Sequence, residues 1–301
     1  MDAAPAFNTL PDFLAHLGYP VPNARLAVHD LADVSPSVPY KSNMFRANYF
    51  TFVLLRGGHS RYTLDDETFE VPPRTLYFTN PGHRKGFELL EPPVAKLLSF
   101  TEEFLRECID VNAYAVFPFL LTERVTPQQL SAEMTDELWQ LIDRIEQELR
   151  PGDPLSEEVA GTYFRVFLLK VKRHLYAHYD PRQEGRGASP IVLRFQRRLR
   201  ERVAALLAGE DYALPQVQEF ADEQAIHPNY LATVISSKTG KTASGWIQEA
   251  IVSAARGLLR TSDKSVKEIA LQLGFEEPAY FSRYFKRVAG RSPSAFRREL
   301  D

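Results

Sequence analysis

Residues 265–298, SVKEIALQLGFEEPAYFSRYFKRVAGRSPSAFRR, contain two short amphipathic segments joined by a turn. Apolar side chains recur at helical spacing in the first segment, at Val266, Ile269, Ala270 and Leu273. Gly274 follows where the chain must leave the helix, since glycine adopts a positive φ without strain. Pro278 suits the first turn of a second helix, in which Phe281 and Phe285 point inward. The stretch therefore predicts a helix-turn-helix. Its outward positions are Arg283, Lys286 and Arg287.

The same pattern occurs earlier in the chain. Residues 217–221 (VQEFA) match 266–270 (VKEIA) at an offset of 49, and Tyr230-Leu231 matches Tyr280-Phe281 at an offset of 50. Further equivalent pairs are Ile235 with Phe285, Gly240 with Gly290, Lys241 with Arg291, and Trp246 with Phe296. Agreement at a fixed period indicates two copies of one helix-turn-helix unit.

The segment between the copies, residues 244–259, is predicted to be one helix. Sixteen residues of helix span about 24 Å. With its flanking turns, such a helix can hold two second helices about 34 Å apart, which is one turn of DNA. The two helices could then enter successive major grooves on one face of a duplex.

Charge is distributed unevenly along the 301 residues, whose formal net charge is −3. Residues 1–185 carry 18 Lys and Arg against 26 Asp and Glu, whereas residues 186–301 carry 18 against 13. The basic half is thus the half that contains the two helix-turn-helix copies, which favours a polyanionic partner for it. A basic run precedes the first copy and can be read as flanking the DNA backbone or as covering a helix; it consists of Arg197, Arg198, Arg200 and Arg202.

The front of the chain has a strand pattern. Aromatic and β-branched residues fill 49–56 and 75–79, and residues 60–64 and 68–71 flank Asp65-Asp66-Glu67 as in a hairpin. Short strands at this spacing predict an antiparallel barrel or sandwich. Apolar residues then recur at helical spacing in 138–149 and 155–179. The second of these helices has enough apolar surface either to pack on the strands or to pair with its copy in a homodimer.

Residues 181–190 (PRQEGRGASP) are polar and rich in Gly and Pro, and we interpret them as a linker. The predicted domains are therefore residues 1–180 and residues 191–301. The amino terminus has no signal-peptide pattern, and the longest apolar stretch, residues 50–55, is too short to span a bilayer. We expect a cytoplasmic protein with no membrane partner.

At this point a family resemblance becomes specific. The Ile-Ala, Gly-Phe, Tyr-Phe-Ser-Arg-x-Phe-Lys and Gly-x-Ser-Pro-x-x-Phe-Arg elements of residues 265–298 resemble the signature of the AraC/XylS family of bacterial transcription regulators. The resemblance covers about residues 194–299. The strand-rich front is similar to the cupin-like sensor domain common in that family. The resemblance implies an α+β fold: an N-terminal cupin-like antiparallel β-barrel with a helical dimerisation segment, and a C-terminal all-α domain of two helix-turn-helix units.

The resemblance also implies roles for individual residues. Arg283 matches the position of a base-contacting arginine, whose guanidinium could bond guanine O6 and N7. The reading positions of the first copy are Asn229, Ala232 and Thr233. The cations expected to contact DNA phosphates are Lys238, Lys241, Lys286, Arg287 and Arg291. RNA polymerase is a partner implied by the family alone.

A cupin-like front offers a pocket. Metal-dependent pockets of that fold need clustered ligands, usually including a His-x-His pair, which this chain lacks, and its single cysteine excludes a Cys-rich zinc site. We therefore expect no metal, no other cofactor and a pocket for a small-molecule effector. The candidate lining residues are His59, Tyr62, Tyr77 and His83.

The sequence thus predicts a sequence-specific DNA-binding transcription regulator, not an enzyme, controlled by a small-molecule effector. One alternative is a cupin-type metalloenzyme with a helical accessory domain, which stoichiometric iron or manganese would support. Another is a helical protein that binds DNA or proteins without sequence preference. Equal affinity for the protein's own promoter and for scrambled DNA at every salt concentration would favour that one.

Overall fold

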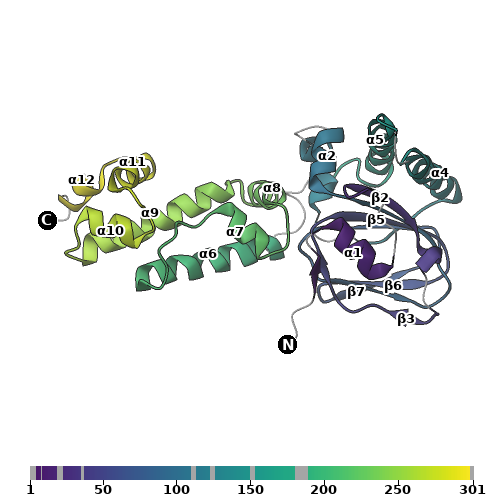
Figure 1. Cartoon of the computed structure of the whole chain (residues 1–301), viewed down its shortest axis with the longest axis horizontal. Coiled ribbons are helices and arrows are strands. Elements are labelled where there is room, and N and C mark those ends of the chain that lie inside the picture. Colours follow the sequence, from purple (N-terminus) through teal and green to yellow (C-terminus); the bar gives the residue numbers. More distant parts are fainter. Residues whose placement is uncertain are drawn as a thin grey trace. The chain divides into compact units, whose positions relative to one another are not determined.

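The computed structural model describes residues 5–7, 9–18, 23–34, 37–109, 113–122, 126–149, 153–179 and 189–298. They form two compact units (Figure 1), the first within Met1–Arg186 and Gln224–His227 and the second within Gly187–Glu223 and Pro228–Asp301. Of the predicted linker, residues 181–188 lie outside the described residues. Ser189 caps the first helix of the second unit, and Pro190 is the first residue of that helix.

The larger sheet of the first unit has five strands in the order β11-β8-β5-β10-β2. Their bounds are Leu26–Asp30 (β2), Phe50–Gly57 (β5), Thr75–Thr79 (β8), Val94–Phe100 (β10) and Gln128–Gln129 (β11). All pairings are antiparallel, and Val53 of β5 lies opposite Leu97 of β10 and Tyr77 of β8. The central strands are buried on both faces, which explains their nearly continuous apolar sequence.

The smaller sheet has four antiparallel strands in the order β3-β9-β6-β7. Their bounds are Tyr40–Lys41 (β3), Ser60–Leu64 (β6), Glu67–Val71 (β7) and Lys85–Leu89 (β9). The predicted hairpin at Asp65-Asp66-Glu67 is confirmed, because β6 pairs with β7 across it. Asp65 adopts a φ of 51°, which a turn aspartate tolerates.

The prediction of a barrel is wrong. No strand of the larger sheet pairs with a strand of the smaller sheet among the described residues, so these two sheets do not close into one cylinder. Consecutive strands β8 and β9 belong to different sheets, and the chain passes between the sheets through a turn at Asn80–Gly82, where Gly82 has a φ of 84°. Of the barrel and the sandwich that the strand pattern allowed, the structure has the sandwich arrangement.

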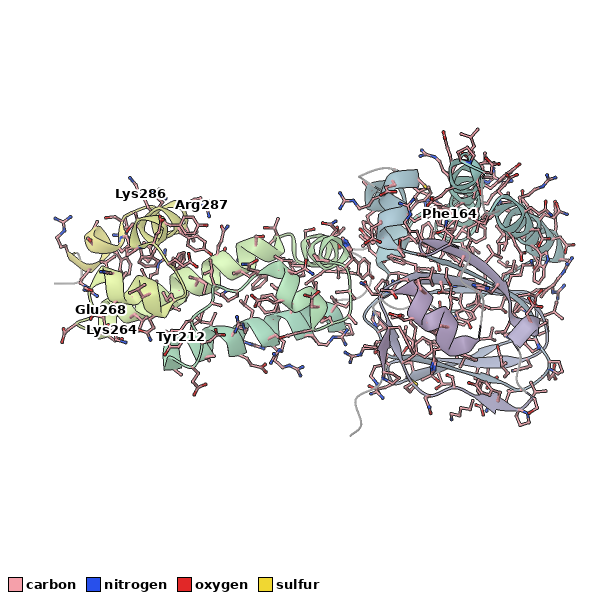
Figure 2. The ribbon with its side chains drawn as sticks, viewed as in Figure 1. Phe164, Tyr212, Lys264, Glu268, Lys286 and Arg287 are labelled. Atoms are coloured by element: carbon pink, nitrogen blue, oxygen red, sulfur yellow. The ribbon has the colours of Figure 1, made fainter. Side chains whose placement is uncertain are left out.

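Two long helices cover the outer face of the larger sheet. In Figure 1, α4 (Ala132–Glu148) and α5 (Ser156–Leu175) lie above the strands β2 and β5. Phe164 of α5, labelled in Figure 2, is fully buried, and its ring centroid lies 4.7 Å from that of Phe100 on β10. The two predicted helices in the middle of the chain are therefore present, and one face of α5 packs on the sheet.

Short elements complete the first unit. Strand β1 (Ala6–Phe7) pairs in parallel with β4 (Arg46–Ala47), and α1 (Leu10–Leu17) packs Leu10, Phe13 and Leu14 against Ala47 and Tyr49. The remaining helices are η1 (Leu31–Val34), α2 (Glu102–Cys108), α3 (Ala113–Val116) and η2 (Pro118–Leu121).

The second unit is helical in its described residues. Its helices are α6 (Pro190–Ala208), α7 (Val217–Asp222), α8 (Pro228–Thr239), α9 (Ala243–Thr261), α10 (Val266–Gln272), α11 (Pro278–Ala289) and α12 (Pro293–Arg298). The helix pairs α7–α8 and α10–α11 are the two predicted copies, and α9 is the predicted helix between them. A capping box of Ser265 and Glu268 begins α10. Glu268 is labelled beside Lys264 in Figure 2.

Candidate DNA-binding surface and effector cavity

The second helices of the two copies, α8 and α11, each have twelve residues and begin at a proline. Each buries one face of large, mainly apolar side chains. The buried side chains are Tyr230, Leu231, Val234 and Ile235 in α8, and Phe281, Tyr284 and Phe285 in α11. In Figure 1, α8 and α11 lie along the upper edge of the second unit, and α6 and α10 lie along its lower edge. The polar side chains of both helices therefore lie outside the set that is buried in the unit.

The residues predicted to read bases differ in accessibility. Arg283 is exposed and has no hydrogen bond or ion pair with any described residue, and Asn229 is exposed too. Ala232 and Thr233 are half-buried, and the Thr233 hydroxyl donates a hydrogen bond of 2.7 Å to the Asn229 carbonyl. Thr233 thus has its methyl group and the lone pairs of its hydroxyl left for a partner.

The predicted phosphate contacts lie around the ends of α8 and α11. Lys286 and Arg287 are on α11, at the edge opposite Lys264 and Glu268 in Figure 2, and Lys286 is exposed. The Arg287 guanidinium lies 5.5 Å from the Tyr284 ring centroid, and Arg291 is exposed with its guanidinium 5.6 Å from the Phe296 ring. Contact with the Tyr284 ring orients the Arg287 guanidinium without using its N–H groups, which can then bind phosphate.

The corresponding cations of the first copy are less accessible. Lys238 at the end of α8 is half-buried. Lys241 forms an ion pair with Glu249 and lies 4.5 Å from the Trp246 ring centroid. A phosphate contact by Lys241 would therefore compete with an ion pair inside the unit.

Two arginines of the basic run bind inside the unit. Arg198 forms two hydrogen bonds of 2.7 Å with the Glu223 carboxylate, and Arg202 forms ion pairs with Asp211 and Glu219. Of the two interpretations of this run, these contacts favour the structural one for Arg198 and Arg202, which join α6 to the segment containing α7. Arg200 remains exposed on α6.

A cavity of about 210 Å³ lies between the two sheets of the first unit. Alternate residues line it, because successive side chains of a strand point to opposite faces. From the larger sheet these are Thr51, Val53, Leu55, Tyr77, Thr79, Ala95 and Leu97. From the smaller sheet they are Tyr40, Ser60, Tyr62, Lys85, Phe87 and Leu89. Phe13, His16 and Phe45 are among those that complete the wall.

Tyr62 and Tyr77, which we predicted as lining residues, lie together on this wall. Their rings stack with centroids 4.7 Å apart, and both side chains are buried. Burial raises the pKa of both phenols, so both stay protonated at neutral pH.

His59 and His83 do not line the cavity. The His59 Nε2 lies 2.6 Å from Glu70 at the surface, and the Nδ1 of the buried His83 lies 2.7 Å from Asp65. Each imidazole thus has its own carboxylate partner. Within the described ranges, no three His, Cys, Asp or Glu side chains gather as a metal site would require.

Lys85 is the main cavity residue that sequence reasoning missed. It occupies an inward position of β9 and is only 2% exposed. Its ammonium donates to Thr79 Oγ1 at 3.0 Å and to the Asn80 carbonyl at 3.4 Å, and lies 5.4 Å from the Tyr49 ring centroid. Desolvation lowers the pKa of Lys85 to about 7. The signal that could have found it is the alternation of KGFEL, in which Lys85 shares a face with Phe87 and Leu89.

Comparisons with known proteins find a match in each of the two units. A family model described as an AraC-like ligand binding domain matches residues 44–164, and one described as a helix-turn-helix domain matches residues 220–299. The HTH-type transcriptional activator RhaR of Salmonella arizonae is 23% identical over 86% of this chain and 89% of its own length.

Solved structures give weaker similarities. ToxT from Vibrio cholerae is 13% identical over 91% of this chain and 97% of its own, with a TM-score of 0.34. The C-terminal domain of AraT from Geobacillus stearothermophilus is 25% identical over 37% of this chain and 86% of its own, with a TM-score of 0.33. Both scores are too low to assign any property of those proteins to this chain.

A ligand-binding sandwich and a unit with two helix-turn-helix copies together define a transcription regulator that binds DNA and senses a ligand. The chain belongs to the AraC/XylS family. Its relatives are transcription regulators. No helix in the part of the chain that the structure describes is both long and apolar enough to cross a membrane.

Proposed function

We propose that α8 and α11 enter successive major grooves of a DNA duplex and read its sequence, with Arg283 as the principal base-contacting residue. The observation that carries this proposal is the pair of equivalent helices at one edge of the second unit, each with an unburied polar face. Helix α9 has 19 residues and so spans about 28 Å, which suits a separation of one DNA turn.

Arg283→Ala is expected to relax the preference at one base pair and to weaken specific binding by about 1–3 kcal/mol, because a bidentate contact to guanine is lost. Lys286→Ala is expected to weaken binding to all sequences alike and to reduce the salt slope by about 1, as loss of a phosphate contact does. Affinities for a set of single-base promoter variants, measured across salt concentrations, check both results.

Arg200→Ala is the matched control for Arg283→Ala, because it removes the same charge from an exposed position of α6. It should leave base preference unchanged. If Arg283→Ala also leaves every base preference unchanged, the role proposed for Arg283 is wrong.

We also propose that α5 forms a homodimer with its copy. One face of α5 packs on the sheet, and the other carries exposed apolar residues at alternating spacings of four and three. These positions are Leu155, Val159, Thr162, Val166 and Leu169, of which only Thr162 is polar. A repeat of 3.5 residues is the pattern of paired helices in a coiled coil.

Leu169→Glu is expected to convert the dimer to monomers, with a dimer dissociation constant raised about hundredfold or more, since a buried carboxylate would replace an apolar contact. Leu193→Glu on α6 is the control, because Leu193 is 47% exposed and Leu169 is 46% exposed. Sedimentation equilibrium of the full chain measures both. A Leu169→Glu protein that remains as dimeric as the control would contradict the assignment of this face.

We further propose that the cavity between the sheets binds the effector, and that the protein acts in the cytoplasm by binding rather than by catalysis. Its partners would be promoter DNA, the effector and RNA polymerase. The exposure of Arg283 and Lys286 supports the DNA partner, and the largely apolar cavity supports the small molecule. Transcription from the protein's own promoter, reconstituted with purified polymerase, tests these roles together.

A further inference from the structure

We propose that the ligand of the first unit is a compact organic carboxylate, whose anionic group binds Lys85 and whose apolar body fills the space between the sheets. This inference rests on the proposed function, in which this cavity is the effector site. It is carried by three features of the cavity: a buried cation without a carboxylate partner among the described residues, two buried phenols without acceptors there, and apolar walls.

The cation is exceptional within its own unit. Lys96 on β10 is also buried, at 7% exposure, and its ammonium lies 2.8 Å from Asp143 and 2.5 Å from Glu146. Lys85, at 2% exposure, forms no ion pair with any residue that the structure describes. Its two hydrogen bonds go to neutral oxygens, which leaves the third N–H of an ammonium for another acceptor. A buried cation normally has a charged partner, and here an anionic ligand would supply it.

Two buried phenols in the cavity wall can donate hydrogen bonds to a carboxylate. The hydroxyls of Tyr49 and Tyr62 are buried and make no hydrogen bond within the described part of the chain. Burial raises the pKa of both, so each keeps its proton and can donate it to an acceptor. Tyr49, Tyr62 and Lys85 all line this cavity, and both the ammonium and the phenol O–H groups are hydrogen-bond donors. An acceptor-only group such as a carboxylate matches this set.

The remaining wall sets the size and polarity of the ligand body. It includes Phe45, Val53, Leu55, Phe87 and Leu97, which offer no polar atoms from their side chains. A cavity of about 150 Å³ lined by such residues is known to hold benzene, and this one has about 210 Å³. A single substituted ring or a short alkyl chain would therefore fit.

The charge state of Lys85 gives this binding a pH dependence. Since the pKa of Lys85 is lowered to about 7, a carboxylate should bind best below pH 7 and progressively less well above it, as the ammonium loses its proton. The other titratable groups on the cavity wall are His16 of α1, Tyr40 of β3, Tyr49, Tyr62 of β6 and Tyr77 of β8. The raised pKa values of Tyr49, Tyr62 and Tyr77 keep these three phenols neutral over this range.

Calorimetric titration of the full chain with benzoate and hexanoate, each compared with its primary amide, tests the proposal. We expect each acid to bind the wild-type protein at pH 6 at least tenfold more tightly than its amide. The acid affinities should fall between pH 7 and pH 9, and the amide affinities should not. Acids that bind no better than their amides, or that do not bind at all, would overturn the proposal.

Three substitutions test whether the carboxylate binds at Lys85. Lys85→Met keeps the length of the side chain and should abolish the preference for acid over amide. Tyr62→Phe should reduce it severalfold. Lys41→Met removes the same charge from an exposed position of β3 and should change nothing. If Lys85→Met does not fold, the pH dependence of the wild-type protein still decides, because a pH-independent acid affinity contradicts binding at Lys85.

The proposed function is tested separately on the same preparations by measuring promoter binding with and without acid. If acids bind at Lys85 but leave DNA binding unchanged, the proposal of a carboxylate ligand is supported, and the proposal that this ligand controls DNA binding is wrong. If promoter binding responds to the neutral amides but not to the acids, the effector role stands and the carboxylate proposal is wrong.

Discussion

Gly274→Ala is expected to abolish specific DNA binding by misplacing α11 relative to α10. Gly274 has a φ of +84°, and a Cβ built there would lie 2.5 Å from the backbone nitrogen of Leu214 and 2.8 Å from the carbonyl carbon of Ala213. Both neighbours are backbone atoms, which cannot move aside as a flexible side chain can. A positive φ costs an alanine about 1–2 kcal/mol, and overpacking adds about 1–3 kcal/mol. Together these are a large part of the roughly 5–15 kcal/mol that stabilises a typical domain.

Gly290→Ala separates the two contributions. Gly290 ends α11 with a φ of +78°, but a Cβ there would meet nothing within 4 Å. Gly290→Ala should therefore lose only the stability that the positive φ costs an alanine, and it should still bind DNA. In a Trp139→Phe background, Trp246 on α9 is the only tryptophan and its fluorescence reports urea unfolding of the second unit. Equal midpoints for the two alanine variants would show that the contact with residues 213–214 is unimportant.

The second unit could be predicted in detail because its pattern is local and repeated. Ile269, Ala270 and Leu273 are buried as their helical spacing predicts, and the equivalent Phe220 and Ala221 confirm the register of the first copy. The need for Gly274 was predicted from the turn alone. What the sequence could not reveal is the close approach of residues 213–214, because that contact joins segments some sixty residues apart.

The first unit could be predicted only at the level of its strands. Alternation along a strand tells which residues share a face but not which strands pair, so the same pattern allowed a barrel and a sandwich. Strand β2 was missed, although it pairs with β10 over five residues. Lys85 was missed because a charged residue is normally exposed. Conversely, His59 and His83 were chosen for their chemistry, but each is paired with a carboxylate away from the cavity.

Lys85→Met is expected to stabilise the first unit, and more so at pH 6 than at pH 9. The pKa of Lys85 is about 7 in the folded chain, against an ordinary value of 10.5. Below pH 7 both states carry the proton, so the whole desolvation penalty opposes folding. Between pH 7 and pH 10.5 the unfolded chain binds more protons than the folded chain, and stability therefore rises with pH. The shift corresponds to a penalty of about 5 kcal/mol at pH 6 and about 2 kcal/mol at pH 9.

The difference between variant and wild type isolates this group, because all other titrations cancel in it. In a Trp246→Phe background, Trp139 on α4 reports urea unfolding of the first unit. The gain in the free energy of unfolding from Lys85→Met should then shrink by about 3 kcal/mol from pH 6 to pH 9. A gain independent of pH would mean that the lysine is not desolvated in the folded chain. A ligand carboxylate that pairs with Lys85 should reverse this dependence on pH, because it stabilises the protonated form of Lys85. The ligand should then raise the free energy of unfolding of the wild-type protein most at low pH. Ligand control of DNA binding further requires that the carboxylate bind one of two folded states more tightly than the other, and a buried ammonium provides that difference when the two states bury Lys85 to different extents.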